Sequence, residues 1–360
     1  MVRTVRWSRG LVAVASALAL LVGCGTAPSS PGALASATEA GPTPFAAPSA
    51  TPSEQVAERV TVRVAALSGP TTIGLVGLMR EADAGTGRQD YEVTTYGTPD
   101  EVVPLLVKGE VDVALLPANL AAVVHQQTRT DDGPAVQAVA VNTLGVLSVL
   151  EHGTAVASLS DLRGRTVYST GKGASPQYVL EHLLRQSGLT PGTDVTVEYR
   201  SEATEVAALL AATPGAVGVL PQPYATGVVA GHADVRVAID LTQAWTDLGN
   251  TSRLVTGVTV VRTAFAAEHP QALADFLADD EESVAFVNDS PAQAAELVVA
   301  AGIVQAAPVA QAAIPACHVV HLTGDELRPA LEGYLSVLHA AQPKSVGGAM
   351  PGDDFYLDVG

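Results

Sequence analysis

Four short polar segments contain residue types that could hold a small solute. Each segment follows an apolar stretch and precedes an expected helix, and they span 68–72, 117–119, 170–176 and 221–224. Thr71, Asn119 and Ser175 suit helix N-caps, and Lys172 adds a cation. Helix N-termini offer free N–H groups and partial positive charge to anionic or carbonyl oxygens. The pattern favours reversible binding of a polar ligand over bond-breaking chemistry.

Each segment by itself also fits ordinary turn and capping chemistry. Gly171-Lys172-Gly173 is not the phosphate-binding P-loop, in which Lys-Ser/Thr follows two glycines at fixed spacing. Ligands of open parallel sheets bind beyond the carboxyl ends of the strands, where these four segments are expected to lie together. The indication therefore rests on the four segments jointly.

Cys317, His318 and His321 form the other group with possible chemistry, since a thiolate and two imidazoles are ligands for a soft metal ion. Strand alternation would send Cys317 and His318 to opposite faces, however, and lone thiols are commonly buried. We expect a structural role for this group, with no metal site and no cofactor.

The elements that must position these residues alternate between strands and helices. Strands are expected at 60–67, 91–96, 111–116, 165–169, 194–199, 216–220, 235–240 and 254–261, with a long apolar run at 136–150. Helices are expected at 72–84, 99–108, 120–127, 176–187, 202–212, 270–288, 291–301 and 325–341. This alternation, with nearly continuous apolar strands, predicts the α/β class, with mostly parallel sheets covered by helices.

The N-terminus has the pattern of a bacterial lipoprotein signal. Three arginines precede an apolar run at 11–22 that is too short for a permanent membrane span, and the run ends in Gly23-Cys24. We expect 1–23 to be removed and Cys24 to be lipidated, which would anchor the protein to the membrane. An ordinary secretory signal is the alternative.

A tether is expected at 24–58, where Pro, Ser, Thr, Ala and Gly dominate without a periodic apolar face. The folded part then begins near Arg59. With Cys24 used for the lipid, Cys317 is the only remaining thiol, so no intramolecular disulfide is expected.

Composition excludes several classes of protein. The chain has 360 residues with 37 acidic and 19 basic side chains, a net charge of −18, which disfavours binding to nucleic acid or to anionic lipid. Charged residues make up only 16% and hydrophobic residues 48%, which excludes disorder of the whole chain. No G-x-S-x-G or H-E-x-x-H motif is present, so an enzyme is not expected.

Several stretches resemble the type II solute-binding proteins of ABC importers, nearest to the branch that binds nitrate, sulfonates, taurine and thiamine precursors. The matching stretches are VRVAALSGPTTIGLVGLM, GEVDVALLPANLAAVV, SLSDLRGRTVYSTGKGASPQYVLEHLL, VVRTAFAAEHPQALADFL and the final GGAMPGDDFY. The resemblance covers nearly all of the chain from Arg59 to Tyr356.

The resemblance implies a two-lobe type II periplasmic binding protein fold joined by two crossover strands, at about 141–150 and 254–261. Lobe one would comprise 59–145 and 254–360, and lobe two 146–253. It also implies an extracytoplasmic monomer that closes on its ligand by hinge bending and delivers it to a membrane permease with its ATPase.

Carried onto this sequence, the resemblance implies ligand contacts from both lobes. The implied residues are Ser68, Thr71, Thr72, Asn119, Asn142, Lys172, Ser175, Gln222 and Tyr224. The ligand would be a solute with oxyanion groups or a heterocycle. No arginine lies in the four segments, so a bidentate clamp on an anion is not visible there.

Two other functions stay open. One is a ligand-sensing lipoprotein that delivers nothing to an importer. The other is an enzyme, because eukaryotic pyrimidine synthases of thiamine biosynthesis share this fold, although their cysteine-rich motif is absent here.

Three further features have structural and functional interpretations. Trp245 could stack on an aromatic ligand or fill a gap between the lobes. The acidic tail at Asp353, Asp354 and Asp358 is expected to be solvated, the alternative being a cation or partner site. The run 279–282 is expected to be the exposed face of a helix.

Overall fold

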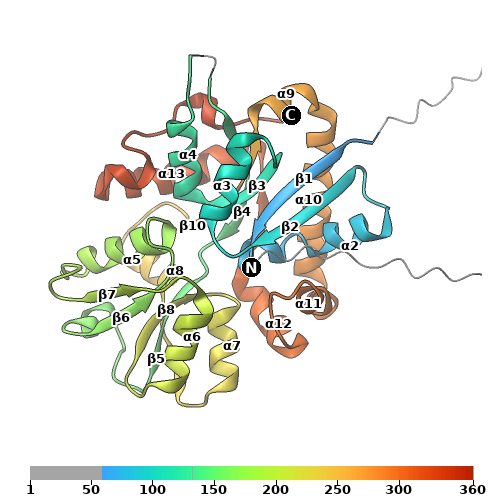
Figure 1. The fold of residues 1–360 in the computed structure, drawn as a ribbon. Helices are drawn as coiled ribbons and strands as arrows, with labels where there is room; N and C mark the ends of the chain where they lie inside the picture. The colour runs from blue at the N-terminus through green and yellow to red at the C-terminus, as the bar shows by residue number, and fades with distance from the viewer. Residues whose placement is uncertain (1–58, 132, 360) are drawn as a thin grey trace, which may run out of the picture. The chain divides into compact units, whose positions relative to one another are not determined.

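Two sheets organise the chain in this computed structural model, which describes residues 59–131 and 133–359 (Figure 1). The six-stranded sheet has the order β11-β4-β10-β3-β1-β2. Its strands are β1 (Thr61–Leu67), β2 (Asp90–Tyr96), β3 (Val113–Pro117), β4 (Val136–Leu144), β10 (Val255–Arg262) and β11 (Val319–Leu322).

The five-stranded sheet has the order β7-β6-β8-β5-β9. Its strands are β5 (Leu147–His152), β6 (Thr166–Ser169), β7 (Thr196–Tyr199), β8 (Val217–Pro221) and β9 (Val235–Asp240). We call the six-stranded sheet with its helices lobe one, and the five-stranded sheet with its helices lobe two.

The predicted α/β class is confirmed, and both sheets are mixed, with most strands of each running in one direction and others antiparallel to them. β1 runs parallel to β2 and β3, and β6 runs parallel to β7 and β8. β10 is antiparallel to β3 and β4, and β5 is antiparallel to β8 and β9. The antiparallel pairs arise because β4 leads the chain from lobe one into β5, and β10 brings it back in the opposite direction.

Helices cover the sheets. In lobe one they are α1 (Pro70–Ile73), α2 (Val76–Ala84), α3 (Pro99–Lys108), α4 (Ala118–Gln127), α9 (Thr263–Glu268), α10 (Pro270–Asp289), α11 (Pro291–Ala300), α12 (Ala307–Ala313) and α13 (Gly324–Ala341). In lobe two they are α5 (Ser175–Gln186), α6 (Ala203–Ala212), α7 (Tyr224–Gly231) and α8 (Leu241–Asp247). Short 3₁₀ turns lie at Leu159–Leu162, Ile314–Cys317, Pro343–Val346 and Asp353–Phe355.

The expected helix at 72–84 is two helices, broken at Gly74 and Leu75. A Cβ on Gly74 would lie 2.9 Å from Cγ1 of Val319, so the chain approaches β11 too closely there for a side chain. The sequence patterns did not predict α8, α9 and α12, which have only six or seven residues each. Elements this short offer too few turns for a helical period to stand out.

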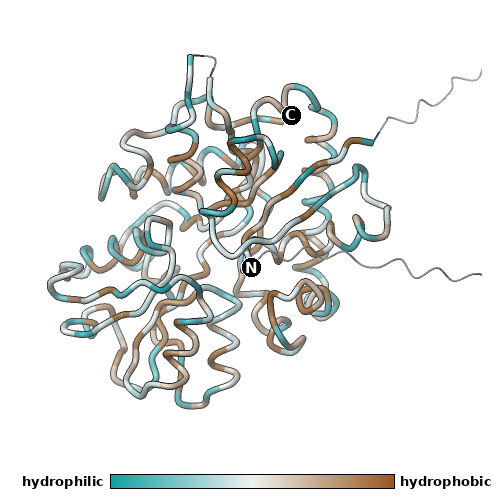
Figure 2. Tube along the Cα trace, viewed as in Figure 1, coloured by the Kyte–Doolittle hydropathy of each residue, from teal (hydrophilic) through white to brown (hydrophobic). Residues whose placement is uncertain are grey.

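The core continues from one lobe into the other. Strands and helices both supply it, and Figure 2 shows both sheets with much of their length in brown. One cluster of buried side chains includes Leu116 and Val141 of lobe one together with Leu183 and Val219 of lobe two. The described residues accordingly belong to one compact unit by their contacts. The domain boundaries expected after residues 145 and 253 stay a prediction.

Only half of the run 279–282 is the exposed helix face that we expected, because Glu281 and Glu282 are exposed whereas Asp279 and Asp280 are buried. Asp279 and Asp280 in α10 are only 2% and 3% exposed. The Asp279 carboxylate accepts hydrogen bonds from the Arg88 guanidinium and from the Tyr91 hydroxyl, at 2.6 Å from the latter. Asp280 pairs with His321, with 2.7 Å between Oδ2 and Nδ1. Partners from distant parts of the chain therefore bury two charges that a local pattern assigns to solvent.

The acidic tail is held by arginines. Arg328 of α13 donates to Asp353 at 2.6 Å, and Arg129 donates to Asp354. Asp358 is exposed. In Figure 1 this C-terminal region lies beside α4, with which α13 is in contact.

The predicted signal 1–23, Cys24 and the tether 24–58 lie outside the described residues. Among the helices of the described residues, none combines the length and the apolar character needed to cross a membrane.

Candidate functional site

The four polar segments follow β1, β3, β6 and β8, at the carboxyl ends of these strands. β1 and β3 are parallel, as are β6 and β8, so each pair of segments lies at one edge of its sheet. The N-cap assignments were wrong, however. The caps of α1, α4 and α5 are Gly69, Pro117 and Ala174, and none makes a side-chain capping bond. Thr71, Asn119 and Ser175 instead lie inside the first helical turns, where their side chains have other partners.

The β1–α1 segment faces lobe two. Ser68 is exposed, whereas the Thr71 and Thr72 hydroxyls are buried and donate to the Leu67 carbonyl at 3.2 and 2.6 Å. A Cβ added at Gly69 would lie 4.0 Å from Cε2 of Tyr224, which opens α7 in lobe two and is half-buried. Ser68, Gly69 and Tyr224 are therefore neighbours across the lobe boundary.

Asn142 and Thr71 meet over Gly257. A Cβ on Gly257 in β10 would lie 2.5 Å from Oδ1 of Asn142 and 2.8 Å from Cγ2 of Thr71, so only glycine leaves room for both. Asn142 is buried, donates to the Thr259 hydroxyl at 3.0 Å and accepts from Thr143 at 2.9 Å. A ligand would have to compete with these bonds for the Asn142 amide.

Asn119 lies on the lobe boundary and is 0% exposed. Its Nδ2 donates to the Ser345 carbonyl at 3.0 Å in lobe one and to the Gly173 carbonyl at 3.3 Å in lobe two. Its Oδ1 accepts from the Ser175 hydroxyl at 3.1 Å. This buried amide is thus fully paired in the present arrangement of the lobes.

Gln222 lies beside the crossover between β4 and β5. Its backbone N–H donates to Val146 at 3.0 Å, and its Oε1 accepts from the Thr226 hydroxyl at 2.8 Å. The peptide bond between Gln222 and Pro223 is cis. The bond to Val146 fixes Gln222 where the chain passes between the lobes.

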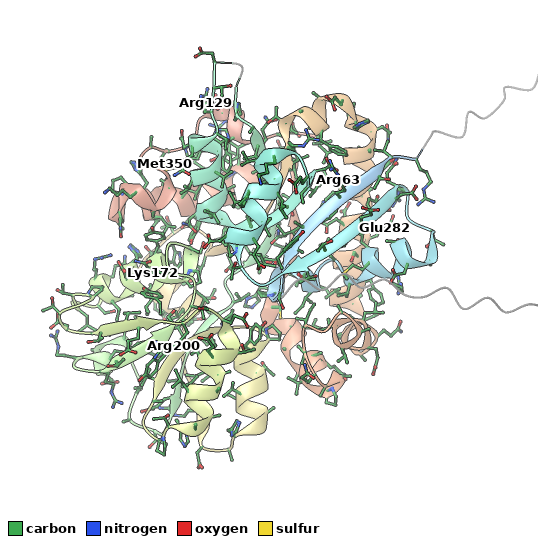
Figure 3. The ribbon with its side chains drawn as sticks, in the orientation of Figure 1. Arg63, Arg129, Lys172, Arg200, Glu282 and Met350 are labelled. Atoms are coloured by element: carbon green, nitrogen blue, oxygen red, sulfur yellow. The ribbon has the colours of Figure 1, made fainter. Side chains whose placement is uncertain are left out.

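Two cations stand at the edge of lobe two, and Figure 3 labels both. Lys172 is exposed in the loop between β6 and α5. Arg200 directly follows β7, and its backbone N–H donates to Ser169, the last residue of β6, at 2.8 Å. The Arg200 guanidinium lies 5.1 Å from the ring centroid of Tyr168 and bonds Glu198 at 3.0 Å. The sequence analysis missed Arg200, although the strand expected at 194–199 ends directly before it.

The group Cys317, His318 and His321 does not assemble into a metal site. Cys317 is fully buried, and burial raises the pKa of its thiol to about 12. The His318 ring pairs with the Gly145 carbonyl, whereas His321 pairs with Asp280. Within the described residues one set of potential metal ligands lies close together, Glu81, Asp279 and Glu282, and Arg88 already bonds two of them.

Trp245 fills space between the lobes and is 1% exposed. Its Nε1 donates to the Ser252 carbonyl at 2.9 Å. The indole packs against His182 of lobe two and Tyr334 of lobe one, with ring centroids 5.3 and 5.9 Å apart. Of the two interpretations of Trp245, the structural one agrees with this burial.

A cavity of about 230 Å³ lies away from these residues, with Gln137, Pro270 and Leu357 in its lining. Gln137 is near the start of β4, at the opposite end of that strand from Asn142. None of the nine expected ligand residues lines the cavity, so it is separate from the candidate site.

Comparisons with known proteins address the family and the fold of this chain. A family model described as "ABC transporter, phosphonate, periplasmic substrate-binding protein" matches residues 78–313. Comparison with the curated proteins gave no match.

Solved structures share the fold at low sequence identity. An ABC transporter protein from Parabacteroides distasonis has a TM-score of 0.66 at 20% identity, covering 83% of this chain and 99% of that one. The aliphatic sulphonate binding protein SsuA from Escherichia coli has a TM-score of 0.63 at 17% identity, covering 80% and 90%. The nitrate-binding protein NrtA from Synechocystis PCC 6803 has a TM-score of 0.54 at 15% identity, covering 67% and 66%.

Proposed function

We propose that this chain, which belongs to the family of periplasmic substrate-binding proteins of phosphonate ABC transporters, captures a small polar solute between its two lobes. The main support is the meeting of strand-end segments across the lobe boundary. The β1–α1 segment of lobe one faces Tyr224 of lobe two, and Asn119 of lobe one bonds the segment that contains Lys172. A solute between these segments would touch both lobes only when they are closed, so binding would shift the hinge equilibrium.

The solute in this proposal has oxyanion groups. Lys172 and Arg200 follow neighbouring parallel strands of lobe two, and together they offer positive charge at one edge of the sheet. Because the chain has a net charge of −18, its long-range field does not attract anions. Local cations must therefore supply the attraction. Arg200 would have to exchange its bond to Glu198 for a bond to the ligand.

The proposed mechanism is reversible capture without a chemical step, followed by delivery to the permease and ATPase of an importer. The family is one of transport proteins. The thiol that could act as a nucleophile, Cys317, is fully buried with its pKa raised to about 12, and a neutral buried thiol is a poor nucleophile. Lobe one and lobe two belong to the same chain, so a monomer suffices for the function.

The place of action that we propose is the outer side of the cell membrane. The family is periplasmic, which places the folded part outside the cytoplasm. The arginines, the apolar run at 11–22 and Cys24 support cleavage at residue 23 and anchoring by lipid on Cys24. The stretch 24–58 would then be the tether between the lipid and the lobes.

Native mass spectrometry of the purified protein, followed by thermal unfolding with added solutes, tests this function. Suitable probes are inorganic phosphate, methylphosphonate, ethanesulfonate and the pyrimidine of thiamine. A true ligand at a hundred times its Kd adds about 2.7 kcal/mol of stability, a rise in Tm of roughly 5 °C. Turnover of a probe would instead identify an enzyme, and no shift with any oxyanion would contradict the proposed solute class.

Replacing Lys172 by Ala should weaken binding of an anionic probe by roughly tenfold to a hundredfold, the effect of losing one charge-assisted hydrogen bond. Because Lys172 is exposed, the Tm of the ligand-free variant should stay unchanged. Isothermal titration calorimetry measures the affinity. Lys108→Ala, at an exposed lysine of α3 in lobe one, is the matched control and should bind like the parent protein. If Lys172→Ala and Lys108→Ala bind the anionic probe with equal affinity, Lys172 does not contribute to the binding site.

A further inference from the structure

Hydrogen bonds between the two lobes are concentrated at one place. Across the described ranges, and apart from the crossover strands, the hydrogen bonds that join lobe one to lobe two involve the side chain of Asn119. At the other places where the lobes approach, such as α7 against α12, the described residues form no hydrogen bond across the boundary. The lobes are therefore joined by hydrogen bonds on the side of α4 and α5 and by packing alone elsewhere. We call the bonds from Asn119 to Gly173 and Ser175 the bridge.

The bridge uses the whole carboxamide of Asn119. Nδ2 donates to Ser345 within lobe one and to Gly173 in lobe two, while Oδ1 accepts from the Ser175 hydroxyl of lobe two. The exposed fractions are 0% for Asn119 and 1% for Ser175. Removing the amide would leave buried groups without partners, which costs more than an exposed hydrogen bond would.

The bridge lies in a buried part of the lobe boundary. Tyr334 of α13 is fully buried, and burial raises the pKa of its hydroxyl while the nearby Ser175 hydroxyl lowers it. Tyr334 also packs against Trp245 of α8. In such a dry contact a hydrogen bond is stronger than at the surface.

We propose that Asn119 is a positioning residue, which holds the Lys172 loop of lobe two against lobe one and thereby sets the closed population of the protein. Gly173, whose carbonyl Asn119 binds, is the residue after Lys172. The bridge exists only while the lobes are together, so its energy favours the closed state. Ligand affinity then depends on Asn119 through closure and without contact with the solute. Only this consequence for affinity rests on the proposed function.

A distance between the lobes tests the bridge without any ligand. Spin labels on Asp100→Cys in α3 and Glu205→Cys in α6 report on opening, because both positions are exposed and lie on different lobes. Cys24→Ser in the full-length protein prevents labelling elsewhere, since Cys317 is buried. In the parent protein the distance between the two spin labels should be mostly the short one of the closed state. Asn119→Ala and Ser175→Ala should each raise the ratio of open to closed protein by roughly five- to tenfold.

Ser283→Ala is the matched control. Its hydroxyl is also buried and bonds Gly74 and Leu78, but all three residues belong to lobe one. This variant should lower Tm while leaving the distance distribution unchanged. If Asn119→Ala behaves in the same way, the bridge is merely structural and the proposal is overturned.

A second measurement separates closure from ligand contact. Apparent affinity scales with the fraction of binding-competent protein. With methylphosphonate as the probe, the loss of affinity in Asn119→Ala should equal its measured loss of closed protein. An affinity loss with an unchanged distance would make Asn119 a direct ligand contact and overturn the proposal. If the parent protein binds none of the probes, the proposed function is wrong. The distance measurement then still shows whether Asn119 stabilises the closed state.

Discussion

Trp245→Ala is expected to lower the free energy of unfolding by about 3–5 kcal/mol, the usual cost of removing a buried tryptophan. The indole is 1% exposed and lies between His182 of α5 and Tyr334 of α13. Its loss removes packing inside lobe two and across the lobe boundary together. Urea unfolding followed by circular dichroism measures the change.

Trp245→Phe is the control for this variant. Phe retains much of the packing but loses the bond from Nε1 to the Ser252 carbonyl, so the expected cost is about 1–3 kcal/mol. If Trp245→Ala lowers the free energy of unfolding by less than about 1 kcal/mol, the indole does not fill the space between the lobes.

Asp112→Asn has the second large expected effect, about 3 kcal/mol of lost stability at neutral pH. Asp112 is 2% exposed and accepts from Arg63 at 2.8 and 2.7 Å and from Arg262 at 3.0 Å. The neutral variant leaves two guanidinium groups side by side. The effect stays at the low end for a broken buried pair because the Arg63 side chain is 39% exposed and can regain water.

The cost of this substitution should depend on pH. Burial by itself would raise the pKa of Asp112, but hydrogen bonds from Arg63 and Arg262 outweigh it and hold the pKa below its usual value. The carboxylate therefore stabilises the fold at any pH above its unfolded pKa of about 3.9, and this stabilisation is lost as the pH falls further. The difference in stability between parent and variant should begin to shrink below about pH 4 and close only as the pH falls through the lowered pKa of the folded state.

Asp90→Asn is the comparison for an exposed pair. Asp90 bonds Arg59 at 2.9 Å, but its side chain is 57% exposed, so the cost should stay below about 1 kcal/mol. Equal losses for both variants at pH 7 would contradict the importance of burial at Asp112. Guanidinium unfolding at pH 3.5, 5 and 7 supplies all of these values.

Much of the fold was predictable because its signals are local. Apolar periodicity over single segments predicted most of the strands and the longer helices, with bounds close to those observed. It also predicted that polar segments follow β1, β3, β6 and β8. The antiparallel course of β10 and β5 was missed because apolar content does not determine strand direction.

The site itself was only partly predictable. Of the nine expected ligand residues, Ser68 and Lys172 are exposed and Tyr224 is half-buried, while the other six are buried with protein partners nearby. Which of these side chains contact a solute stays a prediction. Arg200 could have been included, had the loop after the strand at 194–199 been treated like the other four.

The sequence by itself determined most of the strands and the longer helices, which family the chain belongs to, and which polar residue types stand at the strand ends. Only the tertiary structure decided which of those polar groups are already paired. Asn119 and Ser175 are 56 residues apart, and Asp279 lies 191 residues from Arg88. Whether a polar side chain keeps free hydrogen-bonding capacity depends on such distant partners, whereas capping and periodicity depend on near neighbours.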